Sequence, residues 1–383
     1  MQELSINPPP KRFSMSQEAA FVQELEELDR HSVMWQMTKP EDIQLNAQAE
    51  IGPQKFRLTT LALYQLCQNV CPGLYGFVRE MSGVHRKIEE ARGDYSFGES
   101  IDIINRVVRR RFDSRLHGKI LLRNTKYNTI DGVLSPGYKW LSNLRLYEMT
   151  KEAMKQCNPE PTFWEAQLSG RWLLLRFCNL QPYFQFDLPG LNVGGQQQIP
   201  VNTERFYVGY HFSNDELGRA TVRGAHYLLR KNGHTAALAS LDLKGRVRHS
   251  GAGFEERLAQ LLARTVDRLP DPDMYKAATV ALTDQPLGLG HKLQREESRA
   301  RQRLAEKLAR KELPITVTKK IVASLCSNPS FLTPDVVEFR NTDRTRFDLY
   351  AAMGREAKTL PIRLRESVEH LAYDLLFNKI TLN

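Results

Sequence analysis

The sequence predicts an α+β fold, in which a predominantly antiparallel sheet is flanked by helices and followed by a helical C-terminal region. Apolar and polar residues alternate over 206–213, which is typical of a strand with one buried face. A second β-rich run over 220–231 ends at Asn232-Gly233, a pair that favours a type I′ hairpin turn. Apolar residues then recur at helical spacing within 254–269 and within 364–376, which predicts amphipathic helices beside the sheet.

The remaining elements follow from local patterns. Residues 1–54 are expected to form an arm that packs on the body or on a neighbouring molecule, with a short acidic helix at 17–30. We predict helices at 58–70, 100–112, 143–156 and 296–312, a hairpin of 119–125 with 129–134, and a buried strand at 172–177. After the Asn-Gly turn, we expect a returning strand over 234–241 and a further turn at Lys244-Gly245. The predicted domains are the arm 1–54, an α+β core 55–269 and a helical region 270–383.

Composition limits the classes of function. The chain has 383 residues and a formal net charge of +10, which favours polyanionic partners. No apolar run reaches the roughly 18 residues that span a bilayer, and no signal-peptide pattern opens the chain. Five cysteines, an odd number, indicate reduced thiols. We therefore expect a soluble cytoplasmic protein that does not act in a membrane.

The densest one-signed segment lies at 106–126, where Asp113 is the single acid. Its cations are Arg106, Arg109, Arg110, Arg111, Arg115, Lys119, Arg123 and Lys126. Cations at a helix C-terminus and on a solvated face would explain part of this segment. Because eight cations exceed what a helix dipole needs, the segment also predicts a ridge that contacts phosphates. A second cation-rich stretch at 291–320 leaves the same two interpretations open.

Aromatic residues accompany the cations. Single-strand binders combine cations for phosphates with aromatic faces on which bases stack. Tyr127, Tyr138 and Lys139 follow the first cationic segment, and the central hairpin adds further candidates. These are Arg219, Arg223, Tyr227, Arg230 and Lys231. Core packing is the alternative role for the tyrosines.

The hairpin also resembles a known family. The segment Ser213-Asn214-Asp215-Glu216-Leu217-Gly218, the strand end Arg230-Lys231-Asn232-Gly233 and residues 246–249 resemble the phage/plasmid-like family of the domain of unknown function 932. Residues 58–70, 120–123 and 132–139 add to the resemblance, which covers 55–377. Arg230 and Lys231 stand where that family suggests a cysteine. The resemblance implies carriage on a mobile element in a bacterial host, and it implies no activity or catalytic residue.

Three hypotheses of function follow. The first is a non-catalytic nucleic-acid-binding protein, concretely a single-strand DNA binding or annealing factor in recombination. The second is a protein-interaction or self-assembling module, such as a homo-oligomer, a particle component or a binder of a host protein. The third is a metal-dependent nuclease built on Asp131, Asp215, Glu216 and Asp242, although His211, His226, His234, His249 and these acids also suit structural roles. We predict no catalytic residue, metal ligand or cofactor, and expect Cys67 and Cys71 to be buried free thiols because no second metal-binding pair follows.

Overall fold

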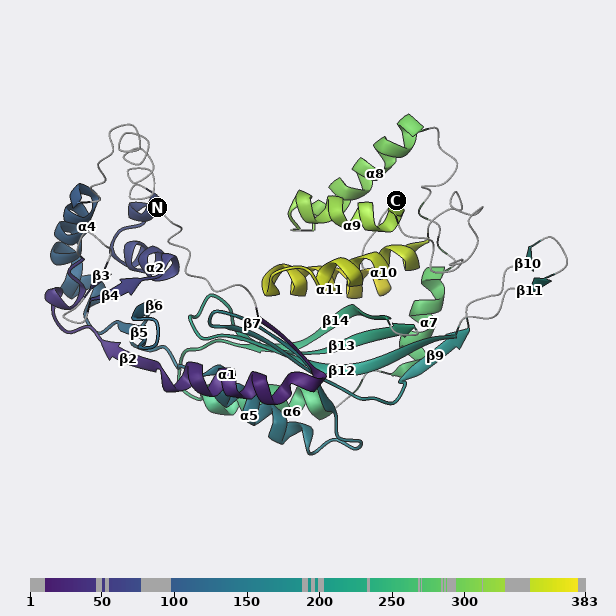
Figure 1. Cartoon of the computed structure of the whole chain (residues 1–383), viewed down its shortest axis with the longest axis horizontal. Coiled ribbons are helices and arrows are strands. Elements are labelled where there is room, and N and C mark those ends of the chain that lie inside the picture. The colour runs from purple at the N-terminus through teal and green to yellow at the C-terminus, as the bar shows by residue number, and fades with distance from the viewer. Residues whose placement is uncertain are drawn as a thin grey trace.

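The computed structural model describes most of the chain, namely residues 11–45, 50–51, 55–76, 98–187, 192–193, 197–198, 203–232, 235–267, 269, 271–283, 285, 287, 294–311, 313–327 and 345–377. A seven-stranded antiparallel sheet lies at its centre, with strand order β1-β7-β8-β12-β13-β14, and β9 pairs with β12 as well (Figure 1). The strands are β1 (Lys11–Ser14), β7 (Thr162–Ser169), β8 (Trp172–Cys178), β9 (Phe184–Asp187), β12 (Thr203–Asp215), β13 (Val222–Asn232) and β14 (Thr235–Val247). The α+β fold predicted from the sequence is confirmed.

The central hairpin differs from its prediction in two details. Asn232 pairs with Thr235, so Asn232 belongs to β13 instead of starting the turn. The turn expected at Lys244-Gly245 is wrong, because β14 continues through it to Val247. The ladder shifts register there, since Gly224 pairs with Gly245 and Ala225 with Leu243. A Cβ atom on Gly245 would lie 2.8 Å from Leu261, so glycine at this irregularity allows the helix behind it to pack closely.

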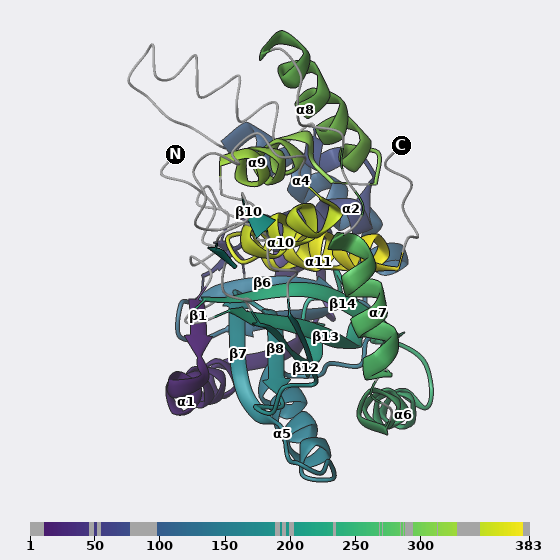
Figure 2. The same cartoon turned by 90° about the vertical axis from the view of Figure 1, so that its right-hand side faces the viewer.

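One face of the sheet is apolar and is covered by three helices, α1 (Glu18–Arg30), α5 (Asn143–Met154) and α6 (Phe254–Asp267). Phe21 of α1, Leu146 of α5 and Leu258 of α6 are buried in the same cluster as Phe177 and Phe212 of the sheet. Figure 1 places these helices below the strands, and Figure 2 shows the same layer end-on. The helix predicted at 254–269 is confirmed in type and place.

The opposite face is covered by C-terminal helices. The helix α11 (Ile362–Leu376) and its neighbour α10 (Arg346–Ala357) lie against this face, and α8 (Gln294–Ala309) and α9 (Ile315–Ser327) form a further layer above them (Figure 2). The helix α7 (Pro272–Thr283) runs beside the layer, and a small ribbon of β10 (Asn192–Val193) and β11 (Gln197–Gln198) lies at the same end (Figure 1). The predicted helical C-terminal region is therefore present and closes one side of the sheet.

A second sheet forms a lobe at one end of the molecule (Figure 1). Its order is β2-β5-β6-β4-β3, and only the β4–β6 pair is parallel. The strands are β2 (Ser32–Gln36), β3 (Glu50–Ile51), β4 (Phe56–Leu58), β5 (Ile120–Asn124) and β6 (Thr129–Leu134). Two helices pack on it, α2 (Thr60–Val70) and α4 (Gly98–Arg111), together with the short helical turns η2 (Pro40–Ile43) and η3 (Phe112–Leu116).

The N-terminal segment expected as an arm is part of both sheets. After β1, the turn η1 (Met15–Gln17) leads into α1, and β2 then pairs with β5. The segment predicted as one core over 55–269 contributes to two separate sheets. Within the described residues, no helix combines the length and the apolar character needed to cross a membrane.

Candidate nucleic-acid interface

Five of the cations that the sequence predicted to contact phosphates are exposed on the helix α4 and the turn that follows it. Ile104, Val108, Phe112 and Leu116 recur every four residues and are buried against the small sheet. This spacing fixes which side of the helix faces outward. The exposed cations are Arg106, Arg109, Arg110, Arg111 and Arg115, the last on η3. Within the described parts of the chain, none of these five forms an ion pair; we call them the α4 cations.

The other three cations of the segment are either partly buried or paired with an acid. Burial lowers the pKa of Lys119 and of Arg123. The Arg123 guanidinium lies 3.9 Å from the ring centroid of Phe56 and 5.2 Å from that of Trp35. Lys126 Nζ lies 2.7 Å from Glu27 Oε1 on α1, and both side chains are exposed. These three residues contribute less free positive charge than the α4 cations.

The two tyrosines near this segment have different environments. Tyr127 is 54% exposed at the turn between β5 and β6, with Lys126 Nζ 5.3 Å from its ring centroid. Tyr138 is half-buried, its ring stacks on His249 at 5.0 Å, and its hydroxyl donates to the carbonyls of Asp215 and Glu216. Tyr127 remains a candidate for base stacking. Tyr138 holds the second sheet to the body, and adjacent Lys139 is exposed.

Three of the four cations predicted on the central hairpin are paired with acids, which corrects that part of the expectation. Arg219 Nε and Nη2 donate to Asp215 at 2.6 and 3.0 Å. Arg223 Nη1 lies 2.8 Å from Glu366 on α11, and Arg230 is buried against Glu204. The side chain of Lys231 lies outside the described residues.

The prediction that Tyr227 stacks on a base is also wrong. Its ring is 2% exposed in the sheet interior and leans over Gly209 on the paired strand. The Arg176 guanidinium lies 4.9 Å from its centroid, and burial raises the pKa of Tyr227 well above the ordinary range. A side chain in this position cannot reach a ligand on the surface.

A ring of buried charges, which the sequence did not indicate, joins α11 to the sheet. Arg176 contacts both Glu165 and Glu369, and Arg365 contacts the same two carboxylates. Although burial acts to raise the pKa of Glu165, Arg365 and Arg176 lower it to about 2. Glu165 is therefore held as an anion, and this ring of charges fixes the position of α11 on the sheet.

His211 beside this ring is held neutral. Its Nδ1 accepts from Arg176 Nε at 3.1 Å, so its Nε2–H donates to Glu366 Oε1 at 2.9 Å. Burial lowers the pKa of His211. Both ring nitrogens are occupied, which gives the histidine a structural role.

Three of the carboxylates considered for a nuclease, those of Asp131, Asp215 and Glu216, form ion pairs with arginines. Arg171 lies in the β7–β8 turn and donates through Nε to Asp131 Oδ2 at 2.7 Å and through Nη1 to Glu216 Oε2 at 3.0 Å. Burial raises the pKa of Glu216 to about 7. Asp215 is bound to Arg219, and the side chain of Asp242 lies outside the described residues. Among the described residues, no group of three or more His, Cys, Asp or Glu side chains is arranged to hold a metal ion.

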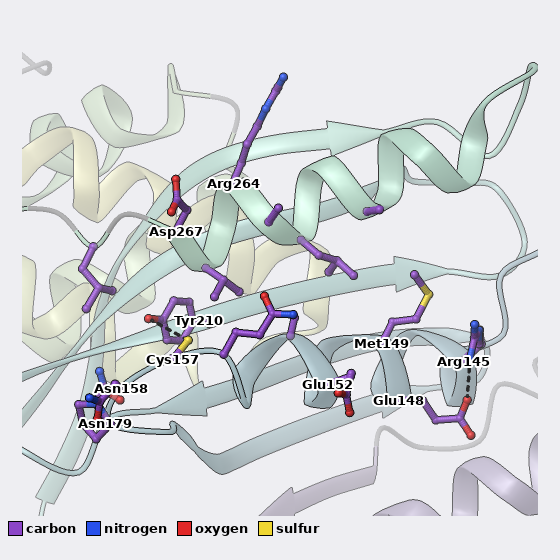
Figure 3. Close-up of a pocket in the computed structure, with 18 residues that line it drawn as sticks. Arg145, Glu148, Met149, Glu152, Cys157, Asn158, Asn179, Tyr210, Arg264 and Asp267 are labelled. Atoms are coloured by element: carbon purple, nitrogen blue, oxygen red, sulfur yellow. Dashed lines mark hydrogen bonds and ion pairs between the residues drawn. The ribbon is translucent and has the colours of Figure 1, made fainter.

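A groove of about 1050 Å³ lies between α5 and α6 (Figure 3). Tyr210 and Cys157 contact each other at its base, with the thiol 3.7 Å from the hydroxyl oxygen. Its rim carries Glu148, Glu152 and Asp267 as well as Arg145 and Arg264, and Arg145 pairs with Glu148. This mixture of charges does not suit a polyanion.

Comparison with known proteins gives no relative: no protein-family model, no curated protein and no solved structure matches this chain.

Proposed function

We propose that this protein binds nucleic acid without catalysing a reaction on it, as a single-strand DNA binding or annealing factor of a phage or plasmid. The α4 cations support the proposal most strongly. Five exposed guanidinium groups follow one another along a single helix and its final turn. Guanidinium groups bind phosphates through paired donors. Each phosphate neutralised in this way releases counterions from the nucleic acid, which makes the binding strongly salt-dependent.

Tyr127 supplies the second component. It is exposed on the same lobe as α4, and Lys126 lies beside its ring. Since every base has a π-face, one exposed tyrosine near cations favours a strand whose bases are unpaired. The assignment to a phage or plasmid rests on the sequence resemblance at 213–218 and 230–233.

Binding of single- and double-stranded oligonucleotides of equal length at about 50 and about 200 mM salt tests the proposal. We expect tighter binding of the single strand and a large loss at the higher salt. Replacing Arg109, Arg110 and Arg111 by alanine should weaken binding, whereas replacing exposed Arg246, Arg248 and Arg264 by alanine removes the same charge elsewhere and should have little effect. Equal losses in the two variants would mean that net charge alone, and not α4, attracts the strand.

A second candidate function is a protein-interaction or self-assembling module, favoured by the edge strand β2. Among the strands that the structure describes, β2 pairs with β5 alone, and it exposes Val33 at 42% and Met34 at 50%. An open strand edge with apolar side chains can pair with another chain. Measuring the oligomeric state with and without DNA separates the candidates. An oligomer whose size does not change when DNA is added, and which dissociates in the Met34→Lys variant, would favour the second.

A further inference from the structure

A pocket of about 430 Å³ lies where β1 and its partner β7 meet the helices α10 and α11. Trp164 and Glu165 of β7 and Arg365 of α11 line it, and Lys358 directly follows α10. The other lining residues belong to β1 and the turn after it, namely Arg12, Phe13, Ser14, Met15 and Gln17. Small-molecule sites typically have volumes of roughly 300–1,000 Å³, so this pocket is large enough for an organic ligand.

The charges that line this pocket do not balance. Its cations are Arg12, Lys358 and Arg365, and Glu165 is the single acid in the lining. Arg365 already belongs to the ring in which two arginines face the carboxylates of Glu165 and Glu369. The side chains of Arg12 and Lys358 form no ion pair or hydrogen bond with any described residue. The pocket therefore has a surplus of two positive charges.

Both surplus cations lie partly out of water and close to other positive charge. Burial is the largest cause that lowers the pKa of Lys358, and although Glu165 acts to raise it, Arg365 lowers it further. Burial of part of the side chain also lowers the pKa of Arg12, and the positive charge of Arg365 adds to this effect. Because burial and like charges both disfavour the protonated forms, an anion in the pocket would stabilise both cations.

The uncharged part of the lining is mainly apolar. Phe13, Met15 and Trp164 line the pocket, and Met15 is 45% exposed. Trp164 is partly buried and packs against the cluster that contains Tyr207 and Tyr227. Small-molecule sites combine such apolar and aromatic walls with a few polar groups that orient the ligand. The pocket therefore suits a ligand that has both an organic ring and a charged group.

We propose that this pocket binds the phosphomonoester of a nucleotide, with Arg12 and Lys358 pairing with the phosphate and the wall around Trp164 contacting the base. A phosphomonoester carries a charge of about −1.5 to −2 at neutral pH, which matches the two surplus cations better than a single carboxylate does. A guanidinium binds phosphate oxygens through paired donors, and a lysine adds a compact charge. This site is separate from the α4 cations, and the inference does not rest on the proposed function.

Calorimetric titration with adenosine monophosphate, adenosine and inorganic phosphate tests the ligand class. We expect the monophosphate to bind at least about tenfold more tightly than adenosine, because adenosine cannot form the charge-assisted hydrogen bonds. Inorganic phosphate should also bind more weakly than the monophosphate, because it makes no contact with the apolar wall. A monophosphate that binds no more tightly than adenosine would overturn the inference.

Variants locate the site. Lys358→Met and Arg12→Met keep an apolar side chain but remove one charge, and each should weaken monophosphate binding about tenfold. Lys11→Met removes the same charge from the neighbouring residue of β1, whose Nζ lies 2.6 Å from Glu24 Oε1 outside the pocket, and should leave the affinity unchanged. Because Arg12 is exposed, Arg12→Met tests the site even if Lys358→Met does not fold. Unchanged affinity in the folded variants of this pair would contradict the assignment.

Two further comparisons identify the source of the ligand and separate this inference from the proposed function. A strand with a terminal phosphate that binds more tightly than the same strand without it, but not in Lys358→Met, would identify a strand end. Monophosphate binding without this strand preference would identify a free nucleotide, and either result supports the pocket. Replacing Arg109, Arg110 and Arg111 by alanine should weaken strand binding and leave monophosphate binding intact. Loss of monophosphate binding in that variant would place the nucleotide on α4 and overturn the inference.

Discussion

Arg230 and Glu204 face each other on neighbouring strands of the central sheet and are joined by two hydrogen bonds of 2.7 Å. Arg230 is 3% exposed, and its guanidinium also lies 5.3 Å from the ring centroid of Phe347 on α10. The pair lies under the helical layer and is closed to solvent. Part of the basic surplus of this chain therefore stabilises the interior, and a polyanion can reach only the remaining cations.

Removing one member of this pair should be costly. In Glu204→Gln, the buried guanidinium of Arg230 loses the carboxylate charge that accepts two of its hydrogen bonds, and we expect the free energy of unfolding to fall by about 3 to 5 kcal/mol. Denaturant unfolding measures the change. The double variant Glu204→Leu with Arg230→Met removes both charges and should recover most of the loss. A double variant no more stable than the single one would contradict this account.

Glu165 should make stability depend on pH in the acid range. Its folded pKa of about 2 lies below its ordinary value of 4.5, because Arg365 and Arg176 hold it as an anion. Its contribution is therefore complete above pH 4.5 and is lost as pH falls toward 2, and it amounts to about 3 kcal/mol. Urea unfolding of wild type and Glu165→Gln at several pH values should give a difference that shrinks on acidification. A constant difference would show that the carboxylate charge is not responsible.

Gly209 should be far more sensitive to substitution than Gly137. A Cβ atom on Gly209 would lie 2.4 Å from the Phe177 carbonyl oxygen and 2.5 Å from the Tyr227 ring, so Gly209→Ala forces the sheet to shift. We expect a loss of about 1 to 3 kcal/mol in unfolding free energy. Gly137→Ala meets no atom within 4 Å and should leave stability nearly unchanged. Similar thermal midpoints for both variants would contradict the close packing of Tyr227 on Gly209.

Local patterns in the sequence predicted the elements well. The alternation at 206–213 lies within β12, and apolar spacing placed α6 and α11 correctly. Such patterns report the direction of each side chain relative to its own element. They do not report which strands pair when those strands are far apart in the sequence. The division into two sheets, and the pairing of β1 with β7 and of β2 with β5, were therefore not predicted.

The candidate site was predicted less completely, because ion partners come from distant segments. Arg223 is paired with Glu366, and Arg176 with Glu369, across separations of 143 and 193 residues. Glu366 and Glu369 stand among apolar residues on α11, a spacing that is also typical of acids exposed to solvent beside the apolar face of a helix. The sequence therefore does not indicate that these two acids are buried. Arg219 is different, since Asp215 lies only four residues away and a local pairing could have been proposed.

The salt dependence of single-strand binding tests the central claim most directly. Each phosphate contacted by a single strand contributes a slope of roughly −0.7 to log affinity against log salt. We predict a steep negative slope for the wild-type protein, reduced in magnitude by about 2 when Arg109, Arg110 and Arg111 are replaced by alanine. A wild-type slope near zero, or a slope that the three substitutions leave unchanged, would contradict the role of α4 in binding nucleic acid.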